Sequence, residues 1–413
     1  GAGTTRVFMG ASCPQRQGAR AVVTFKAMFP ERYVNLDAAR RRFGDRVERL
    51  GAMLTQGDPL ADEAAAALAT LSPSGRGALL DRILSGDGHP RSAPRPVVRL
   101  FEQVHHVPFW VDPERCDRGG AVFLRTGLLG GFVLAFKSLV GGYCSPAGNK
   151  PLAFSGRLKT GASRRLAETG RFVEAVCLPG GMRRGAPGFS AAARVRLMHA
   201  QVRRMLAGSP RWNEAAWGTP INQVDMAGTV LLFSQVVVQG LRQFGVPLEA
   251  DEVEDLLHLW RYAGYVLGVR EELLCATEGE ATVLWDLITG TQAPPDDDAR
   301  ALAEALIQNP ITQARTPEER ARAERFAEIG FGISRYLMGD GYADALGFPR
   351  NRWRFVAPLL RPVLSGATQL VRRLPGVDEL ALNAGIAYWR RAVAMGLGED
   401  EPTFDLPQSV PGA

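Results

Sequence analysis

The sequence predicts an all-α protein with one large helical core. Apolar residues recur at helical spacing along most of the chain, and no stretch alternates apolar and polar residues as a half-buried strand does. Breaks rich in proline and glycine, such as LPGG at 178–181 and GSP at 208–210, end one helical stretch before the next begins. With 413 residues, 46% of them hydrophobic, the chain is long enough to bury a large core.

Residues 1–96 are expected to form an N-terminal segment and helices that pack on the core. The first thirty or so residues mix glycine, proline and arginine without periodicity, and we expect them to be loosely ordered. The stretch Gly86–Pro96 is predicted to link this part to the core. The predicted helices here are Leu36–Gln56, Pro59–Leu71 and Gly75–Leu84.

Residues 97–345 are expected to form the core, and 346–413 to add C-terminal helices and a tail from Gly398 to Ala413. A break is expected at SPAG, 145–148, and another at PPDDD, 294–298. The predicted helices are Val97–His106, Asp112–Arg118, Ala121–Val140, Ser163–Cys177, Ala191–Ala207, Ile221–Phe244, Asp251–Leu267, Arg270–Thr289, Ala299–Gln308, Pro317–Leu337, Trp353–Arg373 and Val377–Met395.

Composition argues against several classes of protein. The net charge is +6, but the arginines are scattered among acidic residues, so no nucleic-acid partner is expected. The five cysteines form no CxxC pair and favour buried thiols. The most apolar run, Thr126–Phe136, is a core helix too short to span a bilayer, so no transmembrane segment is expected. Without a signal pattern, we expect a soluble cytoplasmic protein of bacterial type, or one secreted after leader removal.

His199 is the first candidate for chemistry. Positions 195, 199, 202 and 206 fall on one face of their helix, so the imidazole points into apolar surroundings with Val195, Val202 and Leu206. Such a histidine is either hydrogen-bonded in the core or an axial ligand of haem iron. The other histidines form no metal-ligand spacing; they are His89, His105, His106 and His258.

Two further helices carry polar residues on apolar faces. Arg165 and Thr169 are one turn apart and share a face with Phe172, while Thr229 lies one turn from Asp225 on the most apolar helix. The alternatives are a surface position for Arg165 and, for Thr229, a hydroxyl bonded back to its own helix. Together with His199, these residues outline a pocket that offers one ligand and several donors.

The chain resembles the family that includes rubber oxygenase (latex clearing protein) and MpaB-type oxygenases, also called DUF2236. The similarity extends over about residues 97–290. The motifs that carry it are RLAET at 165–169, RLMHAQVR at 196–203, WGTPINQVDMAGT at 217–229, SPAGNKPL at 145–152 and HLWRY at 258–262.

This resemblance implies a globin-like helical core that binds haem b, with O2 as co-substrate. His199 matches the proximal iron ligand, and Arg165, Thr169 and Thr229 match polar positions of the haem pocket. In rubber-cleaving members, oxygen binds the ferrous iron and a double bond of polyisoprene is split into carbonyl products. Those members carry a distal lysine where this chain has Glu168, and a second distal carboxylate has no counterpart, since the nearby residues are Asn149 and Lys150. The substrate therefore stays open.

From this resemblance and the helix geometry, we predict the following roles. His199 Nε2 binds iron, while Nδ1 donates to Thr229 or a backbone carbonyl. Arg203, or its neighbour Arg204, either pairs with a haem propionate or lies on a solvated helix face. Glu168, with Arg165 and Thr169, is the catalytic candidate, and it shares the pocket with Thr169 only if the haem lies between them.

Three classes of function remain. The first is a haem-dependent oxygenase or dioxygenase acting on an apolar unsaturated substrate, a small isoprenoid or a polymer such as polyisoprene. The second is a globin-like haem protein that binds or senses a gas. The third is a helical interaction protein without a cofactor. The sequence does not determine the oligomeric state.

Overall fold

The computed structural model describes residues 29–86, 92–154, 162–372, 374 and 376–397. Within these ranges the regular structure is helical, apart from an isolated antiparallel bridge between Tyr33 and Gln292. The predicted all-α fold class is confirmed. The expectations for residues 1–28, for His89 and for the tail from Gly398 lie outside the described residues, and the predicted domain boundaries stay predictions.

The N-terminal helices pack on the core through short, capped elements. Asp58 accepts a hydrogen bond from the Ala61 amide and Ser72 from the Gly75 amide, so each caps a helix that starts with proline. Gly44, with φ of 59°, divides the stretch predicted as one helix over Leu36–Gln56. The helices are α1 (Leu36–Phe43), α2 (Arg46–Met53), α3 (Pro59–Leu68), α4 (Pro73–Leu84) and α5 (Arg95–His105).

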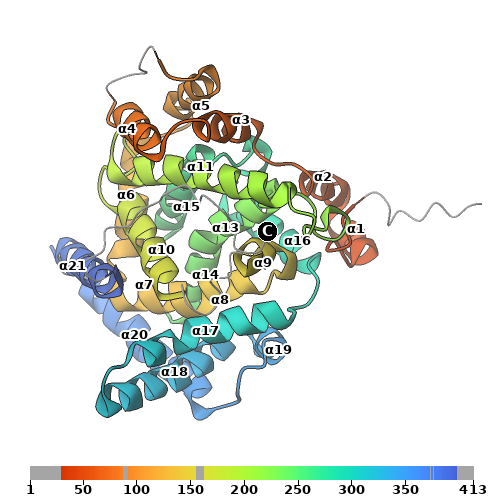
Figure 1. Ribbon diagram of the computed structural model, residues 1–413. Helices are drawn as coiled ribbons and strands as arrows, with labels where there is room; N and C mark the ends of the chain where they lie inside the picture. The colour runs from red at the N-terminus through yellow and green to blue at the C-terminus, as the bar shows by residue number, and fades with distance from the viewer. Residues whose placement is uncertain (1–28, 87–91, 155–161, 373, 375, 398–413) are drawn as a thin grey trace, which may run out of the picture.

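The core is built around the consecutive helices α13 and α14, which lie in the middle of the molecule, with α11 crossing above them and α17 and α18 below (Figure 1). The helices up to the end of α14 are α6 (Pro113–Leu124), α7 (Gly127–Val133), a π-helical turn (Leu134–Leu139), α8 (Val140–Tyr143), α9 (Pro146–Phe154), α10 (Ala162–Cys177), α11 (Pro187–Ala207), α12 (Glu214–Trp217), α13 (Gln223–Phe233) and α14 (Gln235–Gln243).

The second half of the chain completes the core and extends it. Its helices are α15 (Ala250–Val266), a 3-10 turn (Glu271–Leu273), α16 (Glu278–Gly290), α17 (Asp297–Gln313), α18 (Pro317–Met338), α19 (Asp340–Ala345), a second 3-10 turn (Arg352–Phe355), α20 (Val356–Arg372) and α21 (Val377–Leu397).

Further sequence predictions about helix limits were wrong. The helix predicted over Arg270–Thr289 is divided into a 3-10 turn and α16, and the one predicted over Ile221–Phe244 is divided at Ser234 into α13 and α14. The helix predicted over Ala121–Val140 is divided, because α6 ends at Leu124 and Gly127, with φ of 49°, starts α7 at an 89° bend between the helices on either side. The break predicted at 145–148 instead begins α9, since Pro146 is its first residue, where a missing N–H costs nothing.

One helix of the described part of the chain is long and apolar enough to cross a membrane. It runs from Gln223 to Gln243, and 78% of its most apolar window is buried inside the fold. The helices Pro113–Leu124 and Gly127–Tyr143 pass the same test only as a bent pair. Core helices with this degree of burial commonly meet such a criterion.

We expect Gly120→Ala to destabilise the fold by about 1–3 kcal/mol, because glycine lets α6 touch α10. A Cβ on Gly120 would lie 2.1 Å from the carbonyl oxygen of Cys177, and backbone cannot yield as a side chain can. Gly77→Ala is the matched control, since its Cβ would meet nothing within 4 Å and should stabilise α4 slightly. Chemical denaturation measures both; a Gly120→Ala variant as stable as wild type would contradict this account of the packing.

Candidate functional site

The helices α10 and α11 form a hairpin, and their backbones are in contact near the loop that joins them. A Cβ on Gly188 would lie 2.5 Å from the carbonyl oxygen of Ala175, and one on Gly181 would lie 2.1 Å from the same atom. Glycine therefore permits direct backbone contact there. Further along the hairpin, residues of both helices face a common cavity.

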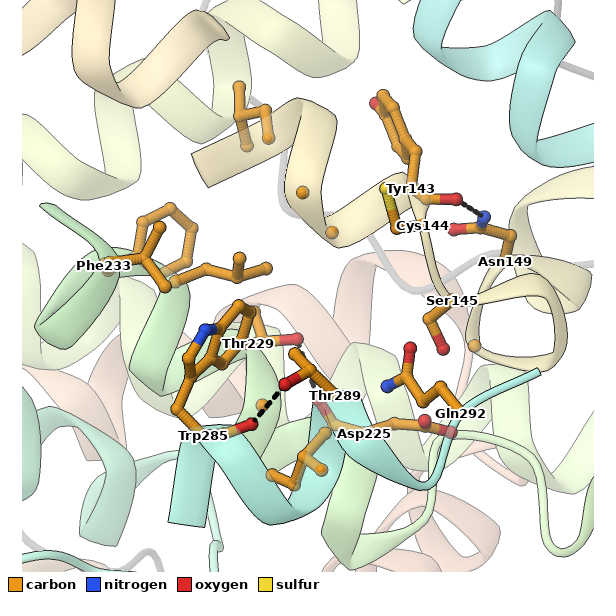
Figure 2. A pocket seen from close by; sticks show the side chains of 18 of the residues that line it. Tyr143, Cys144, Ser145, Asn149, Asp225, Thr229, Phe233, Trp285, Thr289 and Gln292 are labelled. Atoms are coloured by element: carbon orange, nitrogen blue, oxygen red, sulfur yellow. Dashed lines mark hydrogen bonds between the residues drawn. The ribbon is translucent and has the colours of Figure 1, made fainter. Parts of the chain in front are cut away.

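This cavity has a volume of about 1490 Å³. It exceeds the roughly 300–1,000 Å³ of most small-molecule sites, so it has room for more than one small molecule. One wall is a stripe along α13 and α14 at alternating spacings of four and three residues: Asp225, Thr229, Leu232, Val236, Gln239 and Gln243. Figure 2 shows Thr229 and Phe233 on this wall, facing Tyr143 and Cys144 from the segment between the π-helical turn and α9.

His199 lines the cavity from α11 together with Val195, Met198 and Val202. The fourth residue of the predicted face, Leu206, is buried elsewhere in the core. The His199 Nδ1 atom is buried and has no hydrogen-bond partner within the described structure. Burial lowers the pKa of His199 to about 4, and the positive charge of Arg203 adds to the effect. The imidazole is therefore neutral at pH 7, the form that binds a metal.

Buried ion pairs fix α11 on its outer side. Arg196 donates to both carboxylate oxygens of Asp58, at 2.6 and 3.1 Å, and to Gln103 Oε1 at 2.6 Å; the side chains of Arg196 and Asp58 are 4% and 5% exposed. Arg203 is also buried, and it donates to Asp62 at 3.1 Å. Neither arginine lines the cavity.

For Arg203, the predicted solvated face is therefore wrong, because the side chain is buried and paired with Asp62. Its pairing with a haem propionate stays a prediction. Its neighbour Arg204 is the solvent-exposed arginine of the two.

From α10, Glu168, Thr169 and Phe172 all line the cavity. Glu168 and Thr169 are neighbours about 100° apart around the helix, so the cavity lies between their two directions. The structure thus places these two predicted residues and His199 around one space. The backbone of Arg165 is part of α10, but its side chain lies outside the described part of the structure.

Thr229 lines the cavity and donates its hydroxyl to the carbonyl oxygen of Asp225 at 2.8 Å, the local bond that we considered as the alternative. The hydrogen bond predicted from His199 Nδ1 to Thr229 or to a backbone carbonyl is absent from the described residues. The Asp225 carboxylate is held by Arg32, whose guanidinium donates at 2.6 and 2.9 Å. Figure 2 shows Ser145 and Gln292 beside Asp225 at this end of the pocket.

Asn149 and Lys150 lie near the sequence position where rubber-cleaving members carry a second distal carboxylate, and the two side chains have different surroundings. Asn149 lines the cavity and donates to the carbonyl oxygen of Tyr143 at 2.7 Å, as Figure 2 shows. Lys150 instead pairs with Asp296 at 2.8 Å and Asp298 at 2.6 Å. No described carboxylate from this segment faces the cavity.

The sequence analysis did not identify three polar residues that line the cavity near the C-terminal end of α14. Lys137, Gln239 and Gln243 line the cavity there. The stripe on α13 and α14 could have identified the two glutamines, because they continue its spacing beyond Val236. Lys137 looked like the polar boundary of an apolar run, and its inward direction depends on the π-helical turn, which leaves no signal in the sequence.

Within the described residues, the protein is all-α, and a neutral histidine lines a large cavity with a mostly apolar lining. The family model for the ER-bound oxygenase mpaB/B'/Rubber oxygenase catalytic domain matches residues 122–373, and the chain belongs to this family.

A relative and a solved structure agree with this assignment. The chain is 26% identical to the rubber oxygenase of Streptomyces sp. (strain K30) over 304 residues, which are 68% of this chain and 66% of that protein. The solved structure of latex clearing protein LCP in the closed state superposes with a TM-score of 0.66 at 23% identity, and the match covers 86% of this chain and 95% of that one. The second similarity shows that the fold is shared.

Proposed function

We propose that this protein is a haem b-dependent oxygenase that uses O2 to cleave a carbon–carbon double bond in an apolar, isoprenoid-type substrate. The observation that carries the proposal is His199, a neutral and desolvated imidazole with an unpartnered Nδ1 on the wall of a cavity of about 1490 Å³. Family membership and the similarity to a rubber oxygenase support it.

The residues around His199 fit a haem. Val195, Met198, Val202 and Phe172 offer an apolar surface to a haem, and His199 would bind its iron. Thr169 and Thr229 supply hydroxyl groups on the same cavity, and Arg165 and Arg203 remain predicted partners of the haem. When bound, haem b supplies the iron at which O2 is activated.

The chain itself contributes orientation, exclusion of water and a proton site. The apolar residues Leu139, Leu232, Phe233 and Val236 line the remainder of the cavity, where they would hold a hydrocarbon chain and keep bulk water away. Glu168 is the titratable group that α10 contributes to the cavity lined by His199. We propose that its carboxylate accepts and returns a proton, a different task from that of the lysine in rubber-cleaving members.

The size of the cavity favours an oxygenase over a protein that only binds a gas. A diatomic ligand needs little space beyond the haem, whereas this cavity continues along the whole of α13 and α14. Oxygen consumption by the haem-loaded protein with squalene or polyisoprene, together with carbonyl products, tests the proposal. A haem-loaded protein that binds O2 and consumes none with either substrate would favour gas binding instead.

We expect Glu168→Gln to lower turnover by about 10²–10⁴-fold, because glutamine keeps the shape of the side chain but cannot exchange a proton. The pH dependence of turnover should lose the limb that depends on this carboxylate, while the haem spectrum stays unchanged. Steady-state rates across the pH range provide the measurement. Unchanged turnover at every pH would remove Glu168 from the mechanism.

A further inference from the structure

The two ends of the cavity lie far apart along α13 and α14. At the start of α13, Gln223 donates to the carbonyl oxygens of Gly57, at 2.9 Å, and Gly268, at 3.1 Å. A Cβ on Gly57 would lie 2.8 Å from Arg203, and one on Gly268 would lie 2.5 Å from Arg196. These arginines lie about one turn after and one turn before His199 on α11. The beginning of α13 therefore adjoins the His199 end of the cavity.

Lys137 lies at the opposite end. A Cβ on Gly240, in α14, would be 3.0 Å from Lys137 Cδ. The stretch Gln223–Gln243 consists of the consecutive helices α13 and α14, and each helical residue adds 1.5 Å along the axis. The path from Gln223 to Gly240 therefore covers roughly 25 Å of helix, so Lys137 lies several helical turns from the start of α13.

The Lys137 ammonium carries a positive charge that no side chain neutralises within the described structure. Its Nζ donates to the carbonyl oxygen of Leu337 at 2.6 Å, in the last turn of α18, and this bond uses one of its three donors. No ion pair to Lys137 is found among the described residues, and burial alone lowers its pKa to about 8, so the ammonium form still predominates at pH 7.

The neighbours of Lys137 are polar but uncharged. Gln239 and Gln243 line the cavity beside it, and the side-chain oxygen of Gln243 is buried without a hydrogen-bond partner in the described structure. Leu139, Leu232 and Val236 give apolar side chains to the wall between this end and His199, while Thr229 adds a hydroxyl and Glu168, Asp225 and Asp286 add carboxylates to the same cavity. The cavity therefore has a cationic end, a histidine end, and apolar side chains along the wall between them.

We propose that Lys137 binds an anionic head group, a carboxylate, on the substrate, and so holds the apolar unsaturated chain with its far part directed toward His199. The inference rests on the proposed function, since it specifies the substrate of the same cavity. It distinguishes this protein from an enzyme for a pure hydrocarbon, which would leave the Lys137 charge unpaired in a largely apolar cavity. The head group pairs with the ammonium, and the two glutamine amides border it.

Calorimetric titration with farnesoic acid and methyl farnesoate tests this proposal, because the two ligands share one chain and differ in charge. The wild-type protein is expected to bind the acid about 10- to 100-fold more tightly than the ester at pH 7. Lys137→Met should bind the acid as weakly as the wild type binds the ester, whereas Lys137→Arg should keep a preference for the acid. Unchanged ester affinity in Lys137→Met shows that the cavity is intact.

Equal affinity of the wild type for acid and ester would overturn the proposal, and this comparison needs no variant. A preference for the acid that survives in Lys137→Met would also overturn it. Because binding is measured without turnover, its failure is distinguishable from failure of the oxygenase proposal: acid preference without oxygen consumption would contradict only the latter.

Discussion

His199→Ala is expected to purify without a Soret band from expression conditions in which the wild-type protein carries haem. The variant removes the only histidine that lines the cavity in the described structure. The loss of haem affinity should exceed the roughly 10–100-fold that removal of a mere outer-shell partner costs. Absorbance near the Soret region, normalised to protein, measures the effect.

His258→Ala is the matched control for this experiment. His258 is also buried on a core helix, but its Nε2 accepts a hydrogen bond from the Asp112 amide at 3.0 Å and it does not line the cavity. This variant should keep its haem even where it loses some stability. Normal haem content in His199→Ala, or equal loss in both variants, would contradict the assignment of the axial ligand.

Asp58→Ala is expected to destabilise the protein by about 3–5 kcal/mol, because it leaves the Arg196 guanidinium as an uncompensated buried charge. The carboxylate also caps α3 through the Ala61 amide, so its removal loosens two elements at once. Since Arg196 lies one turn before His199, we expect the surviving folded protein to bind haem less tightly. Urea denaturation followed by circular dichroism measures the stability.

Asp81→Ala is the matched control, because it removes a carboxylate of α4 that pairs with Arg194, another arginine of α11, at the exposed surface. Exposed ion pairs contribute only about 0–1 kcal/mol. The difference between the two variants isolates the cost of burial. Equal destabilisation in both would mean that the buried pair does not fix α11.

Much of the fold could be predicted from the sequence because local patterns determine it. The helices at α5, α10, α11, α15 and α18 follow apolar periodicity, and their observed limits differ from the predicted ones by a few residues. The errors occur where the backbone conformation of a single residue determines where a helix begins or ends. Gly44 and Gly127 adopt positive φ and divide predicted helices, and Pro146 starts a helix at a position that looked like a break.

The candidate site was predictable only in part. The spacing on α11 placed His199 with Val195 and Val202 on one face, and the resemblance directed attention to Glu168 and Thr169. Both sets line the cavity. Arg203 looked equivalent to other arginines of its helix, and only the tertiary contact with Asp62 on α3 reveals that it is buried. Contacts between residues distant in sequence leave no periodic signal.

The Lys137 end of the cavity was not predictable for a related reason. A lysine that ends an apolar run normally marks the solvated boundary of a helix. Here the π-helical turn and the end of α18 bring it to the cavity wall.

The pyridine haemochrome spectrum of the purified wild-type protein tests whether the chain binds haem b. We expect the spectrum of haem b at about one haem per chain, held without a covalent link, since His199 is the residue assigned to bind the iron and no CxxCH motif is present in the sequence. A protein that gives no haemochrome after expression with ample haem, while its circular dichroism shows a folded helical chain, would contradict haem binding by this chain.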